Sequence, residues 1–184
     1  MITESVALAP GVVIRPSALK DAEALARSHR RNRVHLAPTE PYRAASFYTT
    51  EGQAERVRGQ LEEDRAGRAA HWLLESDGEI VGHAGLTNIV LGPARSASLG
   101  YWIDGEHLGL GLASAATRFV CEAADARLGL HRVEACTLLD NTASQRVLAK
   151  CGFEEYGVAP GYLYINGAWR DHRLFQKILN DRPM

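Results

Sequence analysis

A glycine-rich segment in the middle of the chain restricts the possible folds more than any other feature. The segment reads His107-Leu108-Gly109-Leu110-Gly111-Leu112-Ala113. It follows a predicted strand, Ser96 to Ile103, and leads into a predicted helix, 110 to about 128, with one apolar stripe. The two glycines leave backbone N–H groups at the positive end of that helix without obstructing side chains. This arrangement suits a pyrophosphate.

Two other interpretations of this segment have to be weighed. Two glycines also occur in turns that bind no ligand, and a GxG pattern alone is weak evidence. A dinucleotide-binding fingerprint is a second alternative, but here Ser114 stands where a third Gly or Ala belongs. The segment also begins several residues past its strand rather than in a tight turn, so dinucleotide binding is disfavoured.

The rest of the chain predicts an α/β protein with a mixed sheet and helices on both faces. Asp77-Gly78 joins two apolar runs, Ala69 to Glu75 and Glu79 to Asn88, and supplies the positive backbone angles of a tight hairpin. Gly100 interrupts its strand and predicts a bulge. Further strands are expected at Val12 to Arg15, Arg132 to Leu138, near Glu155 to Val158, and at Trp169 to Ile178.

Helices are expected to open near Ser17 to Asp21, to run from a cap at Thr50 to about Arg65, and to span Thr142 to Lys150. Asn141 caps the last of these, and Gly152 ends it. The stretch from Val34 to Phe47 contains two prolines and has no clear periodicity. It is typical of a functional loop.

Composition and charge exclude several classes of protein. The 184 residues fit a single domain, 1–184. A net charge of -1 is typical of a globular protein, and without a strong basic excess no direct nucleic-acid binding is expected. No apolar run is long enough to cross a bilayer, and the N-terminal sequence lacks a cationic head followed by a hydrophobic core. We therefore expect no membrane association and a cytoplasmic location.

The cysteines and histidines give no sign of a metal centre. Cys121, Cys136 and Cys151 are widely spaced and form no CxxC, so buried free thiols are expected. The seven histidines include no HExxH pattern. The sequence therefore predicts no metal.

Several motifs together resemble the GNAT superfamily of acetyltransferases. Gly100-Tyr101-Trp102-Ile103 followed by the glycine-rich segment is similar to its acetyl-CoA signature. Asn141-Thr142-Ala143-Ser144 and Lys150-Cys151-Gly152-Phe153 resemble the next segment of the superfamily. More narrowly, 36–43, 99–103 and 162–172 resemble the bacterial ribosomal-protein-alanine N-acetyltransferases.

The resemblance implies a GNAT fold of about seven mostly antiparallel strands, in which the fourth and fifth are parallel and splay apart. It implies acetyl-CoA as co-substrate in that opening, with Gly100 at the bulge. The implied cofactor-binding residues are Tyr101, Trp102, Ile103, His107, Leu108, Gly109, Leu110, Gly111, Leu112, Ala113, Asn141 and Ser144. Asn141 would cap its helix and reach a pantetheine carbonyl, although capping alone is equally well supported.

Two residues are candidates for catalysis. By resemblance, Ser144 bonds or protonates the departing CoA thiolate, whereas an ordinary exposed helix serine is the alternative. Glu40, in the two-proline loop, is the leading candidate for a carboxylate near the amine, and a solvated loop glutamate is its alternative. Some relatives place a glutamate at the position that matches Leu163, so its absence leaves the base open. Tyr162, Tyr164 and Asp171 are further candidates for hydrogen bonds or a water relay.

The acceptor is expected to be a primary amine. A protein α-amino group, with a pKa near 7.7 to 8.0, is roughly a tenth neutral at pH 7, so it needs no strong base. A lysine would require about 4.6 kcal/mol of deprotonation work. A protein N-terminus with Ala or Ser is thus the first hypothesis. A small-molecule amine, a larger acyl group and a non-catalytic CoA-binding domain are alternatives, and the oligomeric state is open, a homodimer included.

Overall fold

The computed structural model describes residues 5–183. Residues 1–4 and 184 lie outside the described residues. They include the first residues of the N-terminal segment and both ends of the predicted domain, 1–184. The strands are β1 (Val6–Ala9), β2 (Val12–Pro16), β3 (Ala70–Ser76), β4 (Glu79–Val90), β5 (Ser96–Ile103), β6 (Arg132–Leu138), β7 (Glu154–Ile165) and β8 (Ala168–Ile178). The α-helices are α1 (Ala22–Arg31), α2 (Arg33–Leu36), α3 (Thr50–Arg65), α4 (Leu112–Ala126) and α5 (Thr142–Lys150), and the 3₁₀ turns are η1 (Leu19–Asp21), η2 (Ala45–Tyr48) and η3 (Gly105–His107).

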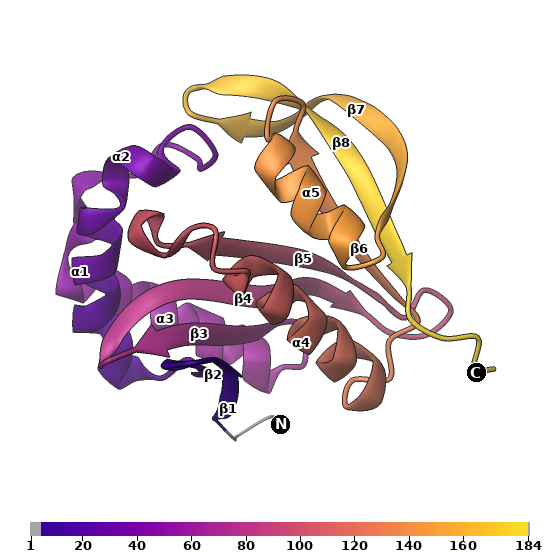
Figure 1. The fold of residues 1–184 in the computed structure, drawn as a ribbon, viewed down its shortest axis with the longest axis horizontal. Helices are drawn as coiled ribbons and strands as arrows, with labels where there is room; N and C mark the ends of the chain where they lie inside the picture. The colour runs from indigo at the N-terminus through magenta and orange to yellow at the C-terminus, as the bar shows by residue number, and fades with distance from the viewer. Residues whose placement is uncertain (1–4, 184) are drawn as a thin grey trace.

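The strands form one mixed sheet in the order β1-β2-β3-β4-β5-β6-β8-β7 (Figure 1). Every neighbouring pair is antiparallel except β5 and β6, which are parallel. The expected mixed α/β architecture is confirmed, but the strand count of about seven was wrong. The unpredicted strand is β1, a four-residue apolar run without alternation that pairs with β2 across a turn at Gly11. The predicted fourth and fifth strands are therefore β5 and β6.

Local sequence signals account for most of the elements. Asp77 and Gly78 have φ of 49° and 79°, which confirms the tight hairpin between β3 and β4. The predicted bounds of β5, β6 and α5 match the structure. The long helix begins later than predicted, at Leu112, because Gly111 has a left-handed φ of 77°. The cap of α3 is Thr49 rather than Thr50, and the predicted loop 34–47 contains most of α2 and part of η2.

Helices cover both faces of the sheet. In Figure 1, α3 lies behind the strands and α4 crosses in front of them, beside α5. Behind the sheet, α1 and α3 enclose a small cluster of Leu25, Val57, Leu73 and Ile80. On the other face the apolar stripe of α4, with Leu112, Ala116 and Val120 at 2% exposure or less, packs into the main core. The core thus fixes the helix whose first turn follows the glycine-rich segment.

The parallel pair separates after only three residues. β5 pairs with β6 from Ser96 to Ser98, while β6 stays paired with β8 and β5 with β4 as far as Ile103. The bulge predicted at Gly100 was wrong, because Gly100 pairs in register with Gly85 and the irregularity in β4 and β5 lies between Thr87 and Val90. Divergence from β6, and not a bulge, opens the sheet at this point.

Candidate active site

A cavity of about 610 Å³ lies where β5 and β6 separate. The end of β5, the glycine-rich segment, the first turn of α4, the end of β6 and the start of α5 line it. The structure brings together eleven of the twelve predicted cofactor-binding residues at this cavity: Tyr101, Trp102, Ile103, His107, Leu108, Gly109, Gly111, Leu112, Ala113, Asn141 and Ser144. Leu110 is the exception, because it does not line the cavity and its exposed fraction is 63%.

The glycine-rich segment has the conformation that an anion site needs. Gly109 and Gly111 have φ of 76° and 77°, and a Cβ added at either one would meet nothing within 4 Å. No side chain caps the N-terminus of α4 at Gly111. The first N–H groups of this fifteen-residue helix are therefore available to a ligand, and the open space before them fits a pyrophosphate.

Asp104 holds the start of this segment against α1. Its buried carboxylate accepts hydrogen bonds from Arg31 Nη2 at 2.6 Å, from Asn32 Nδ2 at 2.7 Å and from the Glu106 backbone N–H at 2.9 Å. Burial by itself raises the pKa of Asp104, but these bonds outweigh burial and lower that pKa to about 2. Asp104 is therefore a charged anchor between α1 and the residues that lead into the cavity.

Asn141 caps α5, as predicted. Its Oδ1 accepts the backbone N–H of Ser144 at 3.1 Å. Because the cap occupies Oδ1, a bond to a pantetheine carbonyl would have to come from Nδ2. The cofactor role of Asn141 stays a prediction.

Ser144 has a partner that the sequence analysis missed. The hydroxyl oxygens of Ser144 and Tyr101 lie 2.8 Å apart, which joins α5 to β5 across the cavity. Burial, followed by the nearby Cys151, raises the pKa of Tyr101 to about 12, although its bond to Ser144 acts in the opposite direction. The Tyr101 hydroxyl therefore keeps its proton and can donate it to Ser144. No spacing signals this contact, because the two residues are 43 positions apart.

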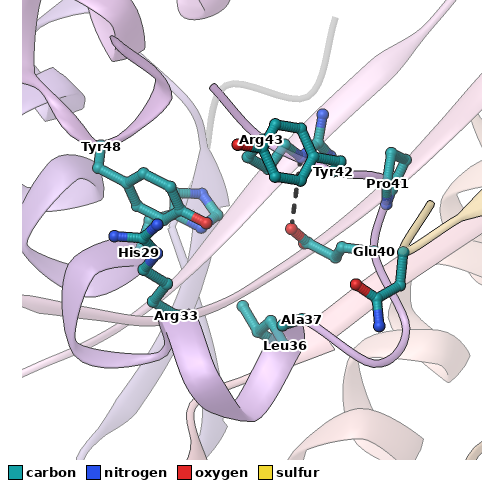
Figure 2. A pocket seen from close by; sticks show the side chains of 10 residues that line it. His29, Arg33, Leu36, Ala37, Glu40, Pro41, Tyr42, Arg43 and Tyr48 are labelled. Carbon is teal, nitrogen blue, oxygen red and sulfur yellow. Dashed lines mark hydrogen bonds and ion pairs between the residues drawn. The ribbon is translucent and has the colours of Figure 1, made fainter. Parts of the chain in front are cut away.

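A second, smaller cavity of about 170 Å³ adjoins the first (Figure 2). Leu36 and Glu40 line both cavities, so they form the boundary between them. Figure 2 shows the Glu40 carboxylate directed toward Arg43, whose Nε lies 3.5 Å away. The Glu40 carbonyl accepts the backbone N–H of Asn166 at 3.1 Å, which ties the two-proline loop to the turn between β7 and β8. Glu40 is thus half-buried at the junction of the cavities.

The other predicted candidates for proton transfer are not brought to either cavity. Tyr162 and Tyr164 line neither cavity. Leu163, at the position where some relatives have a glutamate, lines the larger cavity but has no acidic group. Asp171 is also absent from both linings, and its carboxylate accepts the Gly161 backbone N–H at 2.8 Å. The relay through these three residues has no geometric support.

His172 is a candidate base that the sequence analysis did not single out. It lines the larger cavity and is 3% exposed. Its Nδ1 lies 3.0 Å from the Arg170 carbonyl, which can only accept, so Nδ1 carries the hydrogen. In a neutral ring, Nε2 is then an acceptor. The only sequence signal was its position at the end of the YLYINGAWRDH stretch.

The cysteines are free thiols. Cys121 and Cys151 are buried, and Cys136 is half-buried at the larger cavity. Burial raises the pKa of Cys121 to about 11, so this thiol stays protonated. Within residues 5–183, no group of three metal-ligating side chains comes together, and no helix is long and apolar enough to span a bilayer.

Comparison with known proteins agrees with this geometry. The Acetyltransferase (GNAT) domain family matches residues 12–154. The probable N-acetyltransferase YjcK of Bacillus subtilis is 34% identical over 92% of this chain and 94% of its own length. The [ribosomal protein uS5]-alanine N-acetyltransferase of Escherichia coli is 34% identical over 89% of this chain and 85% of its own.

Solved structures are also similar. The ribosomal-protein-S5-alanine acetyltransferase of Vibrio fischeri superposes with a TM-score of 0.93 at 34% identity, over 98% of this chain and all of the other. Mycobacterium smegmatis RimJ, in complex with CoA-disulfide, has a TM-score of 0.87 at 35% identity, over 91% of this chain and 81% of its own. The resemblance predicted from the motifs is confirmed. This chain belongs to the GNAT acetyltransferase family and is an acetyl-CoA-dependent N-acyltransferase.

Proposed function

We propose that this protein transfers the acetyl group of acetyl-CoA to the N-terminal α-amine of a protein, of which ribosomal proteins are the expected class. One observation carries the proposal: the large cavity with its glycine-lined helix end meets a smaller cavity at Leu36 and Glu40. A thioester held in the first is then accessible to an amine that enters through the second. Relatives named as ribosomal-protein-alanine N-acetyltransferases support this choice of acceptor.

Acetyl-CoA supplies the activated thioester. Beyond Ser98, β5 no longer pairs with β6, so the backbone of Tyr101 to Ile103 has hydrogen-bonding groups free to orient pantetheine. The first N–H groups of α4 hold the pyrophosphate. Because these contacts come from the backbone, they hold the thioester carbonyl of acetyl-CoA in a fixed position.

The proposed reaction is a direct attack. The neutral amine forms the new C–N bond at the acetyl carbonyl, and the C–S bond breaks. Ser144 donates a hydrogen bond to the departing sulfur, and the Tyr101 hydroxyl, which keeps its proton, donates one to the Ser144 oxygen across the 2.8 Å contact. The thiolate then takes its proton from solvent. Glu40 accepts a hydrogen bond from the amine at the cavity boundary and receives the proton that the amine loses.

The acceptor preference follows from amine pKa values. An α-amine is roughly a tenth neutral at pH 7, whereas a lysine side chain requires about 4.6 kcal/mol of deprotonation. The α-amine therefore needs no strong base at the cavity boundary, where the Glu40 carboxylate lies 3.5 Å from Arg43 Nε.

A cytoplasmic location belongs to the same proposal, because an enzyme whose substrates are ribosomal proteins has to meet them in the compartment that holds ribosomes. A single domain over 1–184, a homodimer and the lack of nucleic-acid binding stay predictions. A small-molecule amine is the alternative acceptor.

A peptide screen tests the proposal. Peptides that begin with Ala or Ser should be acetylated at least about tenfold faster than the same peptides blocked at the N-terminus but carrying lysine. Mass spectrometry locates the acetyl group, and thiol release measures the rate. Faster acetylation of the lysine peptides, or of a small-molecule amine, would remove the N-terminal assignment and leave the enzyme class intact.

A further inference from the structure

The small cavity is rich in guanidinium groups. Arg33 and Arg43 line it, and each lies against an aromatic ring: Arg33 Cζ is 4.8 Å from the centre of Tyr48, and Arg43 Cζ is 4.6 Å from that of Phe47. A third guanidinium group lies near the cavity: Arg56 Cζ is 5.7 Å from the centre of the same Phe47 ring. These stacking contacts hold the guanidinium groups in place, and the terminal N–H₂ groups of Arg33 and Arg43 remain available as donors, while Arg43 Nε faces Glu40.

Few negative charges balance these arginines. Among residues 5–183, Glu40 is the one carboxylate within 4 Å of any of them, and it lies 3.5 Å from Arg43. Arg33 and Arg56 have no ion pair within the described part of the chain. Burial, and then the nearby Arg43, lower the pKa of Arg56, although Glu40 acts in the opposite direction. The lining of the small cavity therefore carries two guanidinium groups and one carboxylate, an excess of positive charge.

The unpaired ring nitrogen of His29 is an independent indication that the small cavity binds a ligand. This side chain is 2% exposed, lines the small cavity, and its Nε2 has no hydrogen-bond partner. Burial, together with Arg56 and Arg43, lowers the pKa of His29 to about 3, so the ring is neutral. A buried ring nitrogen without a partner costs stability unless a ligand completes it.

We infer that the small cavity binds a carboxylate of the acceptor, held by Arg33 and Arg43, while the acceptor amine lies beside Glu40. This inference rests on the proposed function and names the feature by which the acceptor is selected. Glu40 lines both cavities whereas Arg33 and Arg43 line only the smaller one, so the site presents one carboxylate and two guanidinium groups to a molecule with opposite charges at its ends. Arginine matches a carboxylate with two parallel N–H donors.

The size of the cavity limits what carries the carboxylate. A volume of about 170 Å³ corresponds to roughly ten water-sized positions, enough for one short side chain. The carboxylate comes either from an aspartate that follows the N-terminal residue of a protein, or from the C-terminus of a very short peptide. The chemistry is the same in both cases, and two pairs of acceptors separate them.

The first pair is Ala-Asp and Ala-Asn at the start of otherwise identical peptides with amidated C-termini. The second is alanyl-alanine and its amide. In each pair, kcat/KM is measured with the wild-type protein and with Arg33→Gln and Arg43→Gln. We also measure the binding of each acceptor to the CoA-bound protein by calorimetry, so that a result does not require turnover.

The control variant is Arg58→Gln. Arg58 is exposed on α3 and lines neither cavity, so this change removes the same charge elsewhere. Melting temperatures confirm that the variants are folded. We expect the wild type and Arg58→Gln to prefer the carboxylate member of one pair by about tenfold, or 1.4 kcal/mol, and both cavity variants to reduce that preference to about twofold.

The outcomes separate the two ideas. Equal use and equal binding within both pairs by the wild type, or a preference that survives both cavity variants, would overturn the carboxylate inference while N-terminal acetylation stands. Binding of the Ala-Asp peptide that depends on Arg43, without acetylation of its amine, supports the inference and removes the proposed function. A preference seen only for alanyl-alanine supports the inference and makes a very short peptide the acceptor.

Discussion

The two cavities are built from different material. The larger one owes its opening and its anion site to the backbone: two glycines with positive φ, an uncapped helix end and a strand that has lost its neighbour. The smaller one depends on side chains, namely two arginines that stack on aromatic rings, a buried histidine and a carboxylate, which come from α1, α2 and the loop that follows (Figure 2). The first has the properties needed for a cofactor shared by many enzymes, and the second has those needed for a particular acceptor.

This difference explains how the family keeps one co-substrate while acceptors vary. Backbone donors do not change when side chains are replaced, so the larger cavity tolerates much substitution. Each side chain of the smaller cavity contributes a specific charge or hydrogen bond, so replacing one changes what is bound. Glu40 and Leu36 line both cavities, so the proposed mechanism places the contact between acceptor and thioester beside them.

The largest expected effect tests the backbone-built cavity. Gly111→Val should lower the affinity for CoA on the order of a hundredfold, or about 2.7 kcal/mol, because a branched side chain would enter the open space before α4. Gly92→Val is the matched control: Gly92 also has a positive φ, 67°, with nothing near its Cβ, but lines neither cavity. It carries similar backbone strain. Calorimetry on both variants separates strain from obstruction, and equal loss in both would refute the anion site.

The next effect concerns the hydrogen-bonded pair of Tyr101 and Ser144 at the larger cavity. Ser144→Ala should lower kcat by about tenfold to a hundredfold and leave acetyl-CoA affinity nearly unchanged, because proton donation matters most when charge develops on sulfur. Tyr101→Phe removes the partner hydroxyl at 2.8 Å and should have a smaller effect in the same direction. Steady-state kinetics and CoA titrations distinguish kcat from binding. Wild-type turnover by Ser144→Ala from pH 6 to 9 would exclude its assigned role.

The smallest expected effect concerns the link between the two regions. Asp104 joins α1, which carries His29 of the small cavity, to the segment that leads into the large one. Its pKa of about 2 lies below the unfolded value near 3.9, so its stabilisation is present above about pH 4 and is lost as the pH falls through 2. Asp104→Asn should therefore remove about 2 kcal/mol at pH 7.

Denaturant titrations at several pH values measure this contribution. The loss caused by Asp104→Asn should shrink between pH 4 and 2, because the wild-type carboxyl becomes protonated there. Glu106→Gln, at an exposed carboxylate two residues away, is the control and should change stability little. A pH-independent loss would show that Asp104 acts by packing rather than by charge.

The sequence alone was sufficient to predict the features that depend on a particular backbone conformation. The Asp77-Gly78 turn, the cap at Asn141 and the glycines at 109 and 111 each require a local backbone geometry that few residues adopt, so residue type and spacing reveal them. The errors arose where local preference is weak. The short strand β1 has no alternation, and the opening at Gly100 depends on how far two separate strands remain paired.

The amino-acid sequence by itself determined the mixed sheet, the family and the glycine-flanked start of α4, because these follow from periodicity, motifs and glycines with special φ. Only the tertiary structure decided that Tyr101 meets Ser144, that His172 lines the larger cavity and that His29, Arg33, Arg43 and Glu40 line one small cavity. The first two join residues far apart in the chain, and the last depends on how α1, α2 and the two-proline loop pack against one another. Their geometry depends on how whole helices and strands pack, which local preferences do not specify.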